Sequence, residues 1–402
     1  MDILYSSDAD FVTAVLRSLV RKGLRLVIVL DNTDQLGEQF QERIFLFAQR
    51  LSQNHKALCI VTLREERFFA AFRRGIFDAF GDRRFHIGSP QLSHVLRARL
   101  EYGSTKFRDL AKTGKLDIRP DELEHIEALL KILIQSTTQR NANIVRMLAC
   151  VSNGDMRHAL GMFRDFVSSG NTDVGKILGI FERQGSYNVS FHEFAKSAIL
   201  GSKKYFRATG SHIVNVFKQS AARRASHITG LRVLARLTHS GDASSQHGEG
   251  FVRTPILLKE YRNSFGYAED FEEVVGEFTR RGLIESEPPR VADASQSSAL
   301  RISASGSYYW RYLVRAFAYV DLVYVDTAIS NQSVARKLAD YATSTEMDAR
   351  FERVRLFLKY LHDCEREELE EVAKRSGPYR QALIPEVAKQ IEREIKQIVG
   401  RL

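Results

Sequence analysis

Two pairs of polar residues directly follow apolar runs, and their types could support metal and phosphate chemistry. Asp31 and Asp34 come after the run at residues 26–30, and Thr62 and Arg64 come after a second such run. Carboxylates bind hard cations such as Mg²⁺, and a guanidinium matches the geometry of a phosphate. Because open α/β sheets bind ligands at the carboxyl ends of their strands, we expect the carboxylates of Asp31 and Asp34 to emerge where a ligand could bind.

The acidic stretch also has a simpler interpretation. The continuous run of β-branched and other apolar residues at 26–30 indicates a strand buried on both faces, as in a parallel sheet. The residues that follow, Asp31 to Asp34, are favourable in turns because Asp and Asn side chains bond to nearby backbone groups. Taken alone, the stretch fits a metal-binding strand end and a buried strand ended by a polar turn equally well.

The elements around these residues predict a parallel α/β sheet at the start of the chain. The sequence pattern indicates, in order, a helix at 8–22 ended by Gly23, the strand at 26–30, a helix at 39–53, a strand at 57–62, a helix at 66–77 and a short strand at 84–88. Alternation of helices and strands is typical of parallel sheets.

From Ser89 onward the pattern becomes helical. Ser89 and Pro90 predict an N-cap and first helical position, and the spacing of apolar residues predicts helices at 92–102, 121–138, 142–151 and 155–167. Further on, helices are expected at 226–238, 254–263 and 268–281, followed by strands near 282–285 and 300–303, which is the layout of a winged helix-turn-helix. The remainder, at 308–319, 347–374 and 384–399, is expected to be helical.

We therefore expect an α/β region followed by an all-α region. The predicted divisions are 1–88 for a partial sheet core, 89–170 for a helical module, 171–224 for a helical connector, 225–306 for a winged helix and 307–402 for a C-terminal helical bundle. A chain of 402 residues is too long for a single core, which agrees with several domains.

Composition narrows the class of protein only slightly. With 44% hydrophobic and 27% charged residues, the chain reads as an ordinary globular protein. Its three cysteines have no metal-ligand spacing, no apolar run is long enough for a bilayer, and the N-terminus lacks a signal pattern, so we expect a cytoplasmic protein that does not contact membranes. The net charge of +10 permits contact with nucleic acid.

These landmarks, in this order, resemble the C-terminal part of an AAA+/STAND-type P-loop ATPase, close in layout to the initiator (origin-recognition) branch. Residues 26–34 resemble its Walker B strand and residues 60–64 its sensor 1 strand. Arg84 and the preceding Arg83 lie where an arginine finger can occur, and residues 89–102 resemble the first lid helix. Residues 152–160, which include Gly154 and Asp155, resemble sensor 2.

The resemblance implies ATP and Mg²⁺ as cofactors. It places Asp31 on Mg²⁺ through water, Asp34 near the attacking water, and Thr62 or Arg64 at the γ-phosphate. Arg84 and Arg157 would contact the nucleotide, the latter from the lid. A regulatory switch that controls self-association or an effector protein is the implied function.

Two departures from the family limit the resemblance. The sequence contains no Gly-x-x-x-x-Gly-Lys-Ser/Thr segment, so it lacks the Walker A loop that holds phosphates. The chain is then either a fragment of a larger ATPase or a non-enzymatic relic that acts as a protein- or DNA-binding scaffold, and hydrolysis requires a P-loop from elsewhere. Asn32 also replaces the usual Glu, so turnover would be slow and would depend on Asp34.

The expected recognition helix at 268–281 is a poor match for DNA. Its first half carries Glu269, Asp270, Glu272 and Glu273, which would repel phosphates. Basic residues that could contact phosphates lie elsewhere, at Lys203, Lys204, Arg207, Lys218, Arg223, Arg224, Arg232 and Arg236. DNA contact is therefore possible but not base-specific, and the aromatic stripe from Tyr308 to Tyr319 is expected to pack in a core rather than stack on bases.

Overall fold

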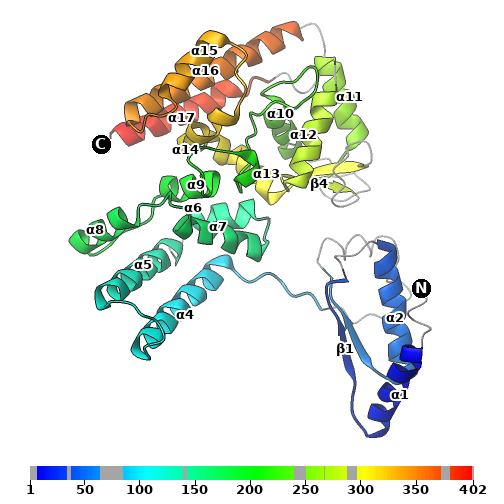
Figure 1. Cartoon of the computed structure of the whole chain (residues 1–402). Helices are drawn as coiled ribbons and strands as arrows, with labels where there is room; N and C mark the ends of the chain where they lie inside the picture. Colours follow the sequence, from blue (N-terminus) through cyan, green and yellow to red (C-terminus); the bar gives the residue numbers. More distant parts are fainter. Residues whose placement is uncertain are drawn as a thin grey trace. The chain divides into compact units, whose positions relative to one another are not determined.

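The computed structural model describes residues 7–33, 38–63, 85–138, 143–239, 250–266, 268–287, 297–372 and 381–400. The chain divides into two compact units, Met1–His86 and Ile87–Leu402 (Figure 1). The helix expected at 66–77, together with Asp34, Arg64, Arg83 and Arg84, lies outside the described residues. The expected divisions within the second unit remain predictions.

The first unit contains a parallel pair of strands with helices. It comprises α1 (Ser7–Arg21), β1 (Val27–Leu30), α2 (Glu38–His55) and β2 (Leu58–Val61). β1 and β2 pair in parallel from Val27 with Leu58 to Leu30 with Val61. Gly23 has a φ of 77° just after α1, as expected of a helix-ending glycine. The prediction of a parallel α/β region is confirmed to this extent.

Two details of the predicted sheet are wrong in the described residues. β1 and β2 are not buried on both faces, because Val27, Val29, Leu58 and Ile60 are 43–59% exposed and α2 packs on the opposite face. No strand forms at 85–88, where Phe85 and Ile87 are among the most exposed apolar side chains described. A strand needs a paired neighbour as well as a suitable pattern, and neither described strand pairs with this segment.

The second unit begins with helices. These are α4 (Leu92–Lys112), α5 (Pro120–Thr138), α6 (Asn143–Val151), α7 (Met156–Ser168), α8 (Val174–Gln184) and α9 (Phe191–Leu200). The predicted helices between 92 and 167 are confirmed, although α4 runs ten residues further than expected. The predicted start at Ser89 and Pro90 is wrong, because Gln91 is the N-cap of α4. Ser89 Oγ instead donates to the carbonyl of Gly154 at 3.5 Å.

A module of helices and a small antiparallel sheet follows. It contains α10 (Thr229–Thr238), β3 (Val252–Arg253), α11 (Thr254–Phe265), α12 (Glu269–Arg280), β4 (Ile284–Glu287) and β5 (Ala299–Ile302). The three strands are antiparallel, with β5 between β3 and β4. We call residues 229–302 the sheet module. It lies beside α13 in Figure 1.

The chain ends in a helical region. It contains α13 (Ala304–Arg311), α14 (Phe317–Val323), α15 (Gln332–Tyr341), α16 (Met347–Glu371) and α17 (Ile384–Val399), with short 3₁₀ turns on both sides of α14. The single helix expected at 308–319 is broken between α13 and α14 by one of these turns. No helix in the described part of the chain is both long and apolar enough to cross a membrane.

An irregular buried segment, Ile213 to Phe217, belongs to the core of the second unit. It belongs to no helix or strand, so its backbone polar groups need side-chain partners. The Tyr309 hydroxyl accepts from Val214 N (2.7 Å), and the Tyr319 hydroxyl accepts from Val216 N (2.9 Å) and donates to Val214 O (2.7 Å). The aromatic stripe therefore packs in the core as predicted, except for the exposed Tyr312.

Candidate functional site

The ends of β1 and β2 bring two of the expected site residues together. The parallel register places Leu30 opposite Val61, so the next residues, Asp31 and Thr62, leave the two strands at the same edge. Thr62 N also donates to Leu30 O at 3.1 Å, which continues the ladder one step beyond the strands. The position of both side chains therefore follows directly from strand pairing.

The two side chains form a direct hydrogen bond. Thr62 Oγ1 donates to Asp31 Oδ1 at 2.5 Å, and the same carboxylate oxygen accepts from Asn32 N at 2.8 Å. Thr33 Oγ1 donates to the Thr62 carbonyl at 2.8 Å, and this second link between the strand ends was not expected from the sequence. The Asp31 carboxylate is thus exposed to solvent yet held in orientation by a hydroxyl and a backbone N–H.

The backbone turns sharply just after this carboxylate. Asn32 has a φ of 58°, in the left-handed region where Asn is tolerated better than most side chains. Thr33 is buried beneath the turn. The polar-turn interpretation of Asp31 to Asp34 is therefore compatible with the metal-binding one, since the turn itself fixes the carboxylate.

The donor set suits Mg²⁺. Asp31 and Thr62 supply carboxylate and hydroxyl oxygens, which are ligands that a hard cation prefers, and Mg²⁺ usually takes only one or two protein carboxylates and keeps its waters. Asp31 would hold such an ion through water, and the Thr62 hydroxyl would orient the carboxylate. Among the described residues, no group of three or more His, Cys, Asp or Glu forms a closed metal cage.

Arg157 lies in the second unit, at the start of α7. Asp155 is the N-cap of this helix, and its Oδ1 accepts from Arg157 N at 2.8 Å and His158 N at 3.1 Å. The side chain of Arg157 is exposed, as a residue that contacts an anion must be. The structure thus brings Asp31 and Thr62 together and places Arg157 in a different unit.

The predicted recognition helix, α12, is largely buried. Its Asp270 carboxylate accepts from Ser226 N at 3.0 Å and from the hydroxyls of Ser220 and Thr229. Glu273 Oε2 accepts from Ala221 N at 2.8 Å. The acidic first half of α12 therefore binds the loop at residues 220–226, before α10, and this conformation leaves no basic face of the helix for a DNA groove.

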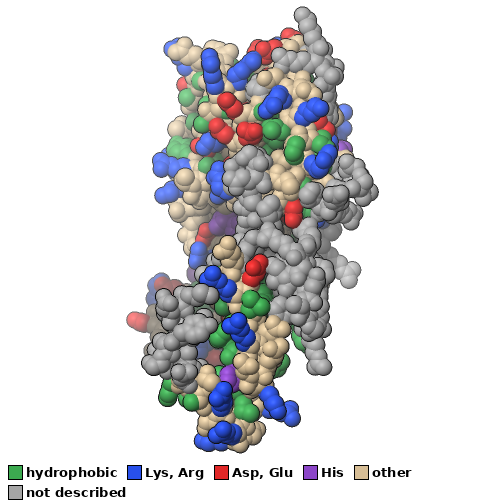
Figure 2. Space-filling model, turned by 90° about the vertical axis from the view of Figure 1, so that its right-hand side faces the viewer, with side chains coloured by type: hydrophobic (Ala, Val, Ile, Leu, Met, Phe, Trp, Pro, Cys, Tyr) green, Lys and Arg blue, Asp and Glu red, His purple; other side chains and the backbone are tan. Residues whose placement is uncertain are grey.

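Half of the basic residues considered for phosphate contact have acidic partners. Arg232 is buried and pairs with Glu368 at 2.8 Å, and Arg236 pairs with Glu260 at 2.9 Å. Lys218 and Arg224 pair in the same way with acidic residues of the C-terminal region. On the face in Figure 2, Lys and Arg side chains are interspersed with acidic and hydrophobic ones. The four paired residues therefore have their charges partly neutralised by carboxylates.

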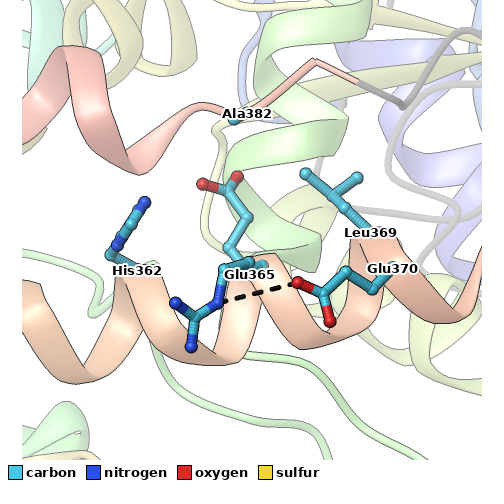
Figure 3. A pocket seen from close by; sticks show the side chains of 6 residues that line it. His362, Glu365, Leu369, Glu370 and Ala382 are labelled. Atoms are coloured by element: carbon cyan, nitrogen blue, oxygen red, sulfur yellow. Dashed lines mark ion pairs between the residues drawn. The ribbon is translucent and has the colours of Figure 1, made fainter. Parts of the chain in front are cut away.

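A depression beside α16 is lined by His362, Glu365, Arg366, Leu369, Glu370 and Ala382. Figure 3 shows the Glu365 carboxylate directed toward the chain segment that precedes α17, and an ion pair between Arg366 and Glu370. Glu365 is fully buried and accepts from Leu383 N (2.8 Å) and Ile384 N (3.0 Å). Burial raises the pKa of Glu365 although these two hydrogen bonds lower it. We interpret this glutamate as a cap of α17, not as a ligand-binding group.

Comparisons of the chain with protein-family models, curated proteins and solved structures found no match. The functional assignment therefore rests on the geometry of the strand ends and on the sequence resemblance.

Proposed function

We propose that the chain is part of a regulatory ATPase of the AAA+/STAND type, in which bound nucleotide acts as a switch. The observation that carries the proposal is the hydrogen bond between Thr62 and Asp31 at the carboxyl ends of two parallel strands. A Walker B carboxylate and a sensor 1 residue require this adjacency, because one holds Mg²⁺ and the other contacts the phosphate that is lost on hydrolysis.

The expected roles follow from the chemistry of each side chain. Asp31 would hold Mg²⁺ through water, and Thr62 would orient that carboxylate or contact the γ-phosphate. Arg157, Arg64 and Arg84 would add positive charge toward the phosphates. Mg²⁺ itself would neutralise charge on the phosphates. Since Asn32 cannot accept a proton from water, Asp34 is the candidate for that role and turnover would be slow. Slow turnover suits a switch.

The sheet module also agrees with the domain layout of the proposed ATPase family. Its order of helix, strand, two helices and two strands, with an antiparallel sheet, agrees with the winged helix that we propose for it. Because α12 is buried and acidic in its first half, we propose a protein-contacting or structural role for this module. Any DNA contact would involve phosphates only, through exposed residues such as Lys203, Lys204 and Arg207.

The decisive experiment measures binding of a fluorescent ATP analogue with Mg²⁺, for this chain and for one extended by the coding sequence upstream of Met1. Asp31→Asn should weaken Mg²⁺-dependent binding at least about tenfold, since the carboxylate that would hold the ion through water is lost. Asp117→Asn, which changes an exposed carboxylate in the other unit, should leave binding unchanged. If neither protein binds the analogue, the ATPase proposal is wrong.

The alternative is a non-enzymatic scaffold that evolved from such an ATPase. The absence of a Gly-x-x-x-x-Gly-Lys-Ser/Thr sequence favours it, because nothing in the chain supplies the phosphate-binding loop. A scaffold predicts no nucleotide binding by either protein and unchanged partner binding in Asp31→Asn. A salt titration of DNA binding would separate a DNA scaffold, whose affinity falls steeply with salt, from a protein scaffold.

A further inference from the structure

One side chain connects the turn before α7 directly to the sheet module. Asn153 lies between α6 and α7, and its Nδ2 donates to the carbonyl of Gly282 at 2.6 Å. Its Oδ1 accepts from Ser305 N, in the first turn of α13, at 2.8 Å. The partners are 129 and 152 residues away in the sequence. A single amide therefore bridges three segments that are remote along the chain.

Only asparagine satisfies both bonds at this position. Asp would keep the acceptor for Ser305 N but lose the donor to Gly282 O, and Gln would be one methylene too long. Asn153 has a φ of 49°, which Asn adopts more readily than most residues. Gly282 has a φ of 73°, and a Cβ there would lie 2.9 Å from Asn153 Nδ2. Both sides of the contact are thus adapted to close approach.

The same turn fixes the start of α7. Asp155, two residues after Asn153, caps the helix through the N–H groups of Arg157 and His158. The helix before the turn, α6, packs against α13, the helix that contains Ser305. The backbone from Asn153 to Arg157 is therefore held at both ends, and the Arg157 side chain is exposed.

A second set of contacts ties α7 to the connector that follows α9. His158 Nε2 lies 3.2 Å from His212 Nδ1, and His212 Nε2 lies 2.9 Å from Asp165 Oδ2. Arg281, which follows α12, donates to the Ser211 carbonyl at 2.8 Å. The end of α12 is thereby linked to the same connector. These contacts join α7 to the end of α12 through the connector, and Asn153 bridges the turn before α7 to Gly282 and Ser305.

We propose that Asn153 is a positioning residue that makes the N-terminus of α7, with Arg157, and the sheet module move as one body. The functional consequence of this inference depends on the proposed function. If a phosphate contacts Arg157, its binding would change the stability of the sheet module through the Asn153 amide. Without Asn153, the two parts would still be linked through the connector contacts of Arg281 and His212 and the packing of α6 on α13, so the coupling would be weaker.

Hydrogen exchange of the full chain, measured without nucleotide, tests whether Asn153 holds the start of α7 and the sheet module together. Asn153→Gly removes the amide but permits the positive φ, so exchange of the Ser305 amide should rise about tenfold while the Val216 amide, bonded to Tyr319, stays protected. Asn153→Asp should keep Ser305 protected because it retains the acceptor. The control Asn171→Gly removes an amide that bonds to Gly201 O, so it should leave Ser305 unchanged.

The nucleotide arm tests the coupling. In the wild type, ATP with Mg²⁺ should slow exchange at Ser305, and in Asn153→Gly the nucleotide should still bind but affect this amide less. The proposal is overturned if Asn153→Gly leaves Ser305 exchange unchanged, or if the nucleotide protects Ser305 equally in both proteins. If neither the chain nor its upstream-extended form binds nucleotide, the proposed function fails, and the nucleotide-free exchange alone decides whether Asn153 positions α7.

Discussion

The hydroxyl of Tyr319 offers the sharpest test of how the core of the second unit is built. Tyr319 is fully buried, and its hydroxyl donates to Val214 O and accepts from Val216 N. The segment around them forms no helix or strand and cannot exchange these bonds for a sheet ladder. Tyr319→Phe removes one oxygen atom and leaves a buried acceptor and a buried donor unpaired.

The expected cost follows from those two groups. A buried polar group left without a partner costs about 1–3 kcal/mol, so Tyr319→Phe should lower the free energy of unfolding by about 2–4 kcal/mol. Tyr309→Phe leaves only Val214 N unpaired and should cost about half as much. The matched control is Tyr312→Phe, since Tyr312 is 50% exposed and should change stability by less than about 0.5 kcal/mol.

Urea denaturation followed by tryptophan fluorescence is the appropriate assay. Trp310 is the only tryptophan of the chain and is buried next to Tyr309, so its emission reports on the second unit alone. The shift in midpoint, multiplied by the slope m, gives the change in free energy. If Tyr319→Phe is no more destabilising than Tyr312→Phe, the buried segment does not depend on this hydroxyl and the account of the aromatic stripe is wrong.

Three further predictions concern the second unit. Burial lowers the pKa of His192 to about 4, below the unfolded value of about 6.5. The contribution of the neutral His192 to stability is therefore complete above about pH 6.5, and up to about 3 kcal/mol of it is lost as the pH falls toward 4. Melting curves of the wild type and His192→Gln should therefore converge in acid. Gly306→Ala should destabilise by at least about 2 kcal/mol, because a Cβ would overlap the Leu283 carbonyl, whereas Gly179→Ala, in the open interior of α8, should stabilise by about 0.5–1 kcal/mol. Asp321→Ala should cost about 3–5 kcal/mol in urea denaturation, because this buried carboxylate pairs with the buried Arg353 and the partly buried Arg350, which would lose their acidic partner. A loss below about 1 kcal/mol would contradict that reasoning.

Local patterns predicted most of the helices, because the periodicity of apolar residues is a local property. The helix expected at 384–399 is α17 without change, and Asp155 caps α7 as its sequence indicates. A local sequence signal predicts the structure less well where a contact with a distant residue competes with it. Ser89 and Pro90 read as a helix start, yet Ser89 bonds to Gly154 and α4 begins at Leu92.

The site shows the same division between local and distant information. The sequence by itself determined that Asp31 and Thr62 follow two apolar runs, and the parallel pairing of those runs then necessarily places the two residues at one edge. Only the tertiary structure decided that α12 is buried, since Asp270 bonds to a loop more than forty residues earlier in the chain. Asn153 could not be identified from its neighbours, because its function depends on Gly282 and Ser305. Spacing along the chain specifies helices and strand ends, whereas a hydrogen bond between remote segments exists only once packing has brought them together.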